Sequence, residues 1–412
     1  MQKTLSLTAP LFIGLLMIMI GNGLQGTLLG VRANIEDFDT TMTGAVMSLY
    51  YVGYFLGCLF IPHYVSSVGH IRVFAAMASL ASVTVLMHGV FPNPFLWGFI
   101  RLFTGFSYAG IFIVAESWLN NIATNKTRGK ILGLYLFTCF GGLVLGQFLL
   151  NLSDPAHIEL FILTSVLVSL SLIPISLSNR PAPEFHEPEH LSLRRLYIIS
   201  PLGLAGSLIT GTASATMVGF AAVYATQMGM SYGQTAFYIA IYLLGGALFQ
   251  IPIGWISDRI DRRATLIGLS FVSALLAFIC YLTSQEIGPL FFLVTFLFGG
   301  TSLAIYGQCI AHTNDHLTHR QIISASSTLI LLSGFGACFG PILASILMNA
   351  FGTEAFFLFL VGNFAAIYLF GIMRVQMRDP VPIEEQSEYI PVPTRSTPVM
   401  MQMATEDEPS SK

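Results

Sequence analysis

The stretch Gly254-Trp-Ile-Ser-Asp258-Arg259-Ile-Asp261-Arg262-Arg263 forms a short charged loop between two long apolar segments. A weaker copy, Pro62-His-Tyr-Val-Ser66-Ser-Val-Gly69-His70-Ile-Arg72, stands about 192 positions earlier and again lies between two apolar segments. A loop that recurs at such a distance predicts a chain built from two related halves.

The composition indicates that the bilayer is the main solvent of this chain. Hydrophobic residues make up 54% of the sequence and charged residues only 9%, against roughly 25% charged residues in an average soluble domain. Apolar spans of about 20 residues, the length that crosses a bilayer, recur along almost the whole chain. We predict twelve of them, with ends placed to within a few residues: 8–31, 42–65, 73–91, 97–118, 130–151, 158–178, 200–225, 234–257, 265–284, 288–311, 323–348 and 354–374.

The Lys and Arg residues predict the orientation of these spans. Arg32 is the one basic residue in the segments on one side, and Arg101 lies within a span, whereas the remaining 16 of the 18 Lys and Arg residues fall on the other side. Cytoplasmic loops carry the excess of Lys and Arg. We therefore expect a multi-pass protein of the plasma (bacterial inner) membrane with both termini cytoplasmic, and a first span that is retained rather than cleaved.

Breaks in the apolar pattern divide the chain into four parts. Residues 1–178 and 198–378 each hold six spans, and the polar, Pro-rich residues 179–197 join them as a cytoplasmic linker. The acidic, Pro-rich residues 379–412 are predicted to be a disordered cytoplasmic tail. The predicted fold class is all-α integral membrane, with twelve transmembrane helices in two six-helix parallel repeats.

Small residues within the spans support the duplication. At offsets of about 192 to 194 positions, the matching residues are Tyr50 and Tyr242, Gly53 and Gly245, Gly105 and Gly299, Gly142 and Gly336, and Gly146 and Gly340. Small residues let two helices approach closely, so we expect equivalent helix contacts in the two halves. Two parallel repeats of membrane helices are typical of secondary transporters.

These motifs resemble those of the major facilitator superfamily. The loop Gly254-x3-Asp258-Arg259-x2-Arg262-Arg263 is similar to the signature that the family carries between the second and third helix of each half, and Arg101-x3-Gly105 is similar to its fourth-helix arginine motif. The resemblance covers about residues 8 to 378 and implies the twelve-helix fold of that family, without specifying a substrate.

A narrower resemblance rests on two stretches in the first half. Val114-Ala-Glu116-Ser-Trp-Leu and Arg128-Gly129-Lys-Ile-Leu-Gly-Leu-Tyr135, with Gly146-Gln147 downstream, resemble the YcaD-like branch of bacterial transporters. The chain departs from the superfamily pattern at Ser66, where the first loop normally has an acid, and at Asp261, where the second normally has Gly. The gate chemistry is therefore expected mainly in the second half.

The second-half loop is a candidate gate at the cytoplasmic end of the bundle. Asp258 can accept hydrogen bonds from helix N–H groups or pair with an arginine across the seam between the halves. Arg259, Arg262 and Arg263 supply the cations. The alternative is that these arginines only set the topology, although topology alone needs no acid at position 258.

Glu116 is the one carboxylate that we predict within a span. The resemblance suggests that it latches to Arg72 or His70 in the first loop, or to Arg128. The alternative is that Glu116 carries a proton, which would need a pKa raised by burial. We favour the latch, because so close to the predicted end of the span its desolvation should be mild.

Polar residues on helices facing the pseudo-symmetry axis are candidates to line a substrate cavity. They are Asn22, Gln25, Tyr108, Tyr135, Gln147, Tyr242, Gln250, Tyr306 and Gln308. Each alone is more often an interhelical hydrogen bond than a ligand contact, but the set predicts a mainly neutral, aromatic-lined pocket. Arg101 can hold an anionic group or tune a neighbour, or it can extend to the outer headgroups.

We expect no metal and no cofactor. His312, Asp315, His316 and His319 stand at helical spacing and would form one stripe if the tenth span continued, but the stripe begins where the membrane ends. The five cysteines all fall inside predicted spans without paired spacing, which predicts no disulfide.

The leading functional hypothesis is a secondary transporter that moves a small organic solute by alternating access. Export driven by coupling to protons is the active-transport version of this hypothesis. The alternative is a non-transporting membrane sensor or scaffold that retains the fold. An enzyme is not expected, because the spans show no nucleophile with a base, and no phosphate-binding loop indicates ATP drive. The expected partners are a small-molecule substrate, protons and the lipid bilayer, with no nucleic acid and a monomeric state.

Overall fold

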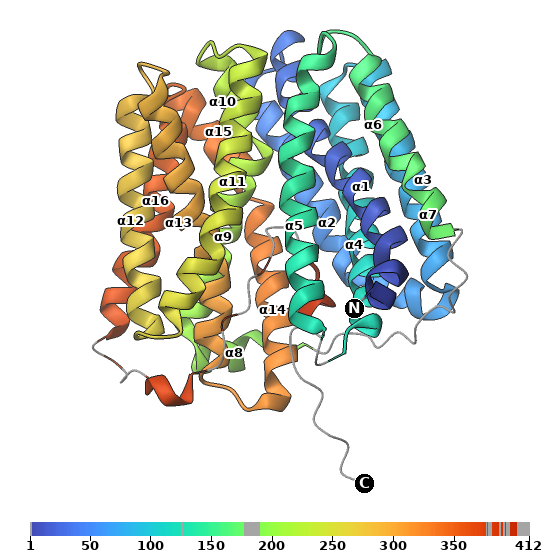
Figure 1. The fold of residues 1–412 in the computed structure, drawn as a ribbon. Helices are drawn as coiled ribbons and strands as arrows, with labels where there is room; N and C mark the ends of the chain where they lie inside the picture. The colour runs from blue at the N-terminus through green and yellow to red at the C-terminus, as the bar shows by residue number, and fades with distance from the viewer. Residues whose placement is uncertain are drawn as a thin grey trace.

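The structure is a computed structural model that describes residues 2–124, 127–176, 190–375, 377, 381–386, 389, 392 and 396–401. The described residues form helices and loops, with no strand among them. The helices stand in two bundles side by side, the amino-terminal half on the right of Figure 1 and the carboxyl-terminal half on the left.

The amino-terminal half crosses the bundle six times. Its helices are α1 (Gln2–Ile35), α2 (Thr40–Val68), α3 (His70–Val90), α4 (Pro94–Ile122), α5 (Arg128–Phe148) with the short η1 (Leu149–Leu152), and α6 (Glu159–Leu170) with α7 (Leu172–Ser176). Polar caps begin several of them: Asp39 accepts hydrogen bonds from the Thr41 and Met42 amides at the start of α2, and Asn93 caps α4 just before Pro94.

The carboxyl-terminal half repeats this order. Its helices are α8 (Leu193–Ile199), α9 (Pro201–Gly219) with α10 (Ala221–Gln227), α11 (Tyr232–Ser257), α12 (Arg262–Thr283), α13 (Pro289–Asn314), α14 (His319–Ala337) with α15 (Gly340–Phe351), and α16 (Ala355–Val375). A last short turn, η2, spans Ile383–Glu385.

Each of the twelve predicted spans coincides with one crossing. Among the described residues, eleven helical stretches are long and apolar enough to cross a membrane, and the remaining crossing, Glu159–Ile175, is apolar but shorter. The predicted fold class, an all-α membrane protein with twelve helices in two six-helix repeats, is confirmed.

The two halves repeat the same helix contact at equivalent glycines. Gly105 on α4 lies against the carbonyl oxygen of Tyr50 on α2, and Gly299 on α13 lies against the carbonyl oxygen of Tyr242 on α11. A Cβ at either glycine would overlap that oxygen. The matching residues in the sequence therefore mark backbone-to-backbone packing that only glycine permits.

The two signature loops differ in backbone conformation. Gly69 joins α2 to α3 with a φ of 95°, a left-handed conformation that favours glycine. Asp261, which replaces the family's glycine in the second loop, has a φ of −53° and caps α12 by accepting a hydrogen bond from the Arg263 amide at 2.9 Å. The sequence departure at position 261 thus exchanges a flexible turn for a helix cap.

The loops at Gly69, Ala123–Thr124 and Asp258–Asp261 lie at one end of the bundle, which we call the basic end after its arginines. It is the lower end in Figure 1. At the opposite end the two halves touch. The Gln227 side chain donates to Thr40 Oγ1 at 2.8 Å, the Ile342 amide donates to Ser48 Oγ at 3.1 Å, and Gly30 packs on Ala222. The two halves are therefore in contact at the opposite end.

The chain between and after the halves is more structured than the sequence predicts. Residues 179–189 of the predicted linker lie outside the described residues, but α8 occupies 193–199 and is capped by Ser192. In the tail, which we predicted to be disordered, Ser396–Met401 are buried between the halves. The average composition of the tail hides the local apolar run Val399-Met-Met401, which fills space at the basic end.

Candidate functional site

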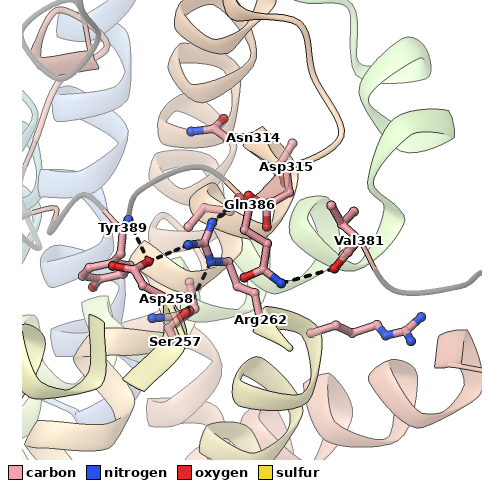
Figure 2. Close-up of polar contacts among 12 residues, drawn as sticks. Ser257, Asp258, Arg262, Asn314, Asp315, Val381, Gln386 and Tyr389 are labelled. Carbon is pink, nitrogen blue, oxygen red and sulfur yellow. Dashed lines mark hydrogen bonds and ion pairs between the residues drawn. The ribbon is translucent and has the colours of Figure 1, made fainter. Parts of the chain in front are cut away.

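Arg262 is the centre of a charged cluster at the basic end of the carboxyl-terminal half (Figure 2). Its guanidinium pairs with Asp258 at 2.6 Å and with Asp315 at 2.7 Å, and its Nε donates to Ser257 Oγ at 3.3 Å. The Arg262 and Asp315 side chains are 1% and 2% exposed, whereas Asp258 is 36% exposed. Ser257 in turn donates to Gln308 Oε1 at 2.6 Å.

This cluster joins three helix ends of one half. Asp258 ends α11, Arg262 begins α12 and Asp315 ends α13. The sequence predicted that Asp258 would bind helix N–H groups or an arginine across the seam, but in this structure its arginine partner belongs to the same half. The cluster therefore connects helix ends within the carboxyl-terminal half and does not join that half to the other one.

The other two arginines of the loop have separate surroundings. Arg259 donates to the Trp255 carbonyl at 2.9 Å, and its guanidinium lies over the Trp255 ring at 3.8 Å from the ring centre. Arg263 approaches Asp261 at 4.0 Å. Arg259 is exposed, whereas the Arg263 side chain is 11% exposed.

The first-half loop holds polar contacts of its own. His70 contacts Ser117 Oγ at 2.8 Å, Ser66 donates to the His63 carbonyl at 2.8 Å, and Arg72 is exposed while Arg128 is buried. That the gate chemistry lies mainly in the second half stays a prediction.

Glu116 is fully buried and faces the interior between the halves. Tyr135 donates a hydrogen bond to its Oε1 at 2.6 Å, and Thr397 of the tail donates to Oε2 from its amide at 3.1 Å and also from its hydroxyl. The expected partners Arg72 and Arg128 do not bind it. The expectation of mild desolvation was also wrong, because α4 continues to Ile122 and places Glu116 deeper than the sequence indicated.

A cavity lies between the halves. Tyrosines from both halves dominate its polar lining: Tyr50, Tyr51 and Tyr54 from α2, and Tyr306 from α13. The remaining lining comes from Phe55, Cys58, Gly211, Ser214, Ala215, Ile330, Leu331, Ser333, Gly334, Ala337 and Ser396. None of these described lining residues carries a formal charge.

Of the residues predicted for the cavity, Tyr306 is the one in this lining. Several others form hydrogen bonds between helices, which polar residues within membrane spans do more often than they bind a ligand. Gln147 binds Thr27 and donates to the Gly23 carbonyl at 2.9 Å, and Tyr242 contacts Ser302 at 3.2 Å. Asn22, Gln25 and Tyr108 are buried within the amino-terminal half.

The remaining predicted cavity residues lie toward the basic end. Tyr135 binds Glu116, Gln308 belongs to the Arg262 cluster, and Gln250 donates to the Val392 carbonyl of the tail at 3.4 Å. These three residues were predicted for the cavity, and none of them is in the lining described above.

Arg101 is buried, with 4% of its surface exposed. Its guanidinium lies 4.6 Å from the centre of the Tyr50 ring and donates to Met47 Sδ at 3.6 Å. It therefore does not extend to the outer headgroups. Because Tyr50 also lines the cavity, Arg101 supports one wall of the cavity through that ring.

The histidine stripe is divided between different contacts. The His312 and His316 rings pack edge to face at 5.1 Å, while Asp315 is held by Arg262. Among the described residues, no group of three His, Cys, Asp or Glu side chains is arranged to hold a metal ion. The His319 side chain lies outside the described set.

Sequence reasoning missed two parts of the site. The cavity wall on α2 carries Tyr50, Tyr54 and Cys58 at intervals of four residues, and this helical stripe was detectable from the sequence. The tail contacts were not detectable, because they join Thr397 to Glu116 across 281 positions.

A bundle of two six-helix halves around a central cavity is the architecture of many secondary transporters. The family model of the Major Facilitator Superfamily matches residues 11–241 and again residues 202–403. The chain belongs to the Major Facilitator Superfamily.

Relatives and solved structures agree with this assignment. The chain is 24% identical over 376 residues to the uncharacterized MFS-type transporter YcaD of Salmonella typhimurium and of Salmonella typhi, covering 90% of this chain and 97% of each relative. The nucleoside transporter NupG matches with a TM-score of 0.72 at 13% identity over 89% of this chain and 98% of that one. A bacterial homologue of the human lysosomal transporter Spinster, in an inward-facing and occupied conformation, matches with a TM-score of 0.72 at 14% identity, covering 92% and 98%.

Proposed function

We propose that this protein is a carrier that moves a small, neutral, ring-containing organic solute through the cavity between its halves by alternating access. The observation that carries the proposal is the lining of that cavity. Tyr50, Tyr51, Tyr54 and Tyr306 offer ring faces and hydroxyl groups from both halves. A site shared by two halves that rock against each other can be opened to either side of the membrane.

The charge of the cavity lining supports this class of solute. A charged solute would lose its hydration without a counter-charge among the described lining residues, which is costly. A neutral ring with a few hydrogen-bonding groups loses less and gains ring contacts.

Glu116 is the group that we propose for proton coupling. Ser396 lines the cavity and the next residue, Thr397, binds Glu116, so the carboxylate lies beside the cavity on the side of the basic end. Among the described residues, no arginine or lysine forms an ion pair with Glu116, which accepts hydrogen bonds from the hydroxyl and amide donors of Tyr135 and Thr397. This geometry favours proton carriage over the latch that the sequence suggested.

The proposed orientation places the basic end and both termini in the cytoplasm of a bacterial inner membrane, in agreement with the excess of Lys and Arg there. The halves contact each other at the opposite end. We propose export against inward proton movement, by a monomer without a cofactor, with the solute entering from the cytoplasm when the basic end opens.

A thermal-shift screen of the purified protein tests the binding part of this proposal. The library should contain neutral aromatic, anionic and cationic compounds. A ligand at 100 times its Kd adds about 2.7 kcal/mol to the stability of the folded state. We expect neutral aromatic compounds to give the shifts, and Tyr306→Ala to remove them.

Tyr368→Ala is the matched control, because Tyr368 packs on Phe271 outside the cavity lining. It should leave every ligand-induced shift in place. Stabilisation by charged compounds alone, or shifts that survive Tyr306→Ala, would contradict the proposed site.

A further inference from the structure

Tyr389, Val392 and Ser396–Met401 are tail residues that lie at the basic end of the seam between the halves. We call them the docked segment. Thr397, Val399, Met400 and Met401 are fully buried, and Val392 is 2% exposed. Burial this complete is unusual for the end of a chain, where residues are poorly ordered unless tied down.

The docked segment is hydrogen-bonded to the amino-terminal half. Thr397 donates from its amide and its hydroxyl to Glu116 on α4, and Tyr54 on α2 donates to the Ser396 carbonyl at 3.4 Å. The Tyr54 contact also places Ser396 at the wall of the central cavity.

The same segment is hydrogen-bonded to the carboxyl-terminal half. The Tyr389 amide donates to Asp258 at 3.0 Å, Gln250 donates to the Val392 carbonyl at 3.4 Å, and Ser327 donates to the Pro398 carbonyl at 3.2 Å. One short peptide therefore bridges both halves at the end where they must separate or close.

The Tyr389 ring packs closely against the carboxyl-terminal half. It lies against Gly254 on α11 and Gly307 on α13, and a Cβ at either glycine would overlap the ring. Burial raises the pKa of the Tyr389 phenol, and the neighbouring Asp258 adds to this effect, so the ring stays neutral there. Gly254 and Asp258 belong to the signature loop, which thus holds the ring of Tyr389 and its backbone amide.

We propose that the basic end of the seam is a peptide-binding site whose ligand is the chain's own tail, and that the docked segment holds the carrier in an inhibited state. Docking covers Glu116, closes the cavity at Ser396 and ties the two halves together. Rocking of the halves then requires the segment to leave. This inference goes beyond the proposed transport function and does not depend on the identity of the solute.

A native cysteine reports on the docked segment. Cys58 lines the cavity that Ser396 closes, and its side chain is buried. In a variant that keeps Cys58 and carries alanine at Cys139, Cys280, Cys309 and Cys338, the labelling rate with a small charged thiol reagent measures access to the cavity from the basic end.

Two truncations separate the docked segment from the rest of the tail. Deleting residues 387–412 removes the segment, and labelling of Cys58 should become about tenfold faster or more, as expected when a dominant closed population is lost. Deleting residues 402–412 keeps the segment and should leave labelling unchanged. A synthetic peptide of residues 389–401 should restore protection to the shorter protein. About millimolar peptide is needed, because a short tether gives an effective concentration of that order.

Point variants in the full-length chain provide an independent route if the shorter protein does not fold. Tyr389→Ala with Thr397→Val removes the ring and the hydroxyl, and it should also speed labelling of Cys58. Equal labelling of Cys58 in the folded truncated protein and the full-length protein would overturn the proposal, as would equal labelling in the double variant. Faster labelling that the peptide does not reverse would overturn the binding site and leave a tail that serves only to fill space.

Discussion

Thr397 donates two hydrogen bonds to the carboxylate of Glu116, one from its backbone amide and one from its hydroxyl, although 281 positions separate the two residues. A third donor, the Tyr135 hydroxyl, reaches the same carboxylate at 2.6 Å. These three donors replace water that a carboxylate has in solution and offset part of the cost of burying Glu116, which has no ion pair with any arginine or lysine in the described part of the chain. The membrane carboxylate of this carrier is thus held by the chain's own tail.

Glu116→Gln is expected to disturb two properties at once. Gln keeps the shape of the side chain but loses the charge, and hydrogen bonds to a charged group contribute about 1.5–3 kcal/mol each. Docking of the tail should weaken, so Cys58 should label faster. In proteoliposomes the variant should exchange solute but no longer respond to an imposed pH gradient. A variant that slows both exchange and net flux but keeps the pH response would restore the latch hypothesis.

The two acids around Arg262 should differ in their effect on stability. Asp315 is 2% exposed, and removing one partner of a buried pair costs about 3–5 kcal/mol. Asp258 is 36% exposed, and an exposed pair contributes about 0–1 kcal/mol. We expect Asp315→Asn to lower the apparent free energy of unfolding, measured by SDS titration in mild detergent, much more than Asp258→Asn. Equal losses would show that the cluster is not organised by burial.

The repeated glycine contacts give a paired prediction. Gly105→Ala and Gly299→Ala each place a Cβ against a carbonyl oxygen of the neighbouring helix, and overpacking of this kind costs about 1–3 kcal/mol. Gly133→Ala is the control, because no atom lies within 4 Å of a Cβ at that exposed helical position. It should be neutral or stabilising by about 0.5–1 kcal/mol. If SDS titration shows that Gly133→Ala destabilises the protein as much as Gly105→Ala and Gly299→Ala do, the argument for close packing is contradicted.

The orientation of the protein can be tested with reporter fusions. A reporter after residue 195 and one after residue 378 should both be active in the cytoplasm, while one within residues 152–157 should be active outside. The reason is the placement of 16 of the 18 Lys and Arg residues on one side of the predicted spans. An outside reading from either of the first two fusions would contradict the proposed sidedness.

The spans and the duplication were predictable because they depend on local patterns. Apolar length identifies a crossing, and the spacing of Gly105 and Gly299 identifies equivalent helix contacts. The depth of Glu116 was not predictable, since α4 continues beyond the last strongly apolar residues to Ile122. The sequence did not decide which arginine pairs with Asp258, because the pairing depends on where the helix ends lie relative to one another.

The average composition of the tail does not predict that part of it docks against the helices. Its Pro-rich, acidic average is typical of disorder, but a docked peptide needs only a few apolar residues and a surface of fitting shape. That surface is assembled from Glu116, Gln250, Asp258 and Ser327, which come from distant parts of the chain. No pattern within residues 379–412 reveals it.

The most direct test of the account is solute uptake into proteoliposomes that contain the protein lacking residues 387–412, with a compound found by thermal shift and an imposed pH gradient. We predict uptake into the vesicle lumen that is driven by the gradient, lost with Tyr306→Ala, and several times slower in the full-length protein. A compound that binds at the Tyr306 site but never crosses the membrane, even without the docked segment, would contradict the carrier and indicate a non-transporting sensor with the same fold.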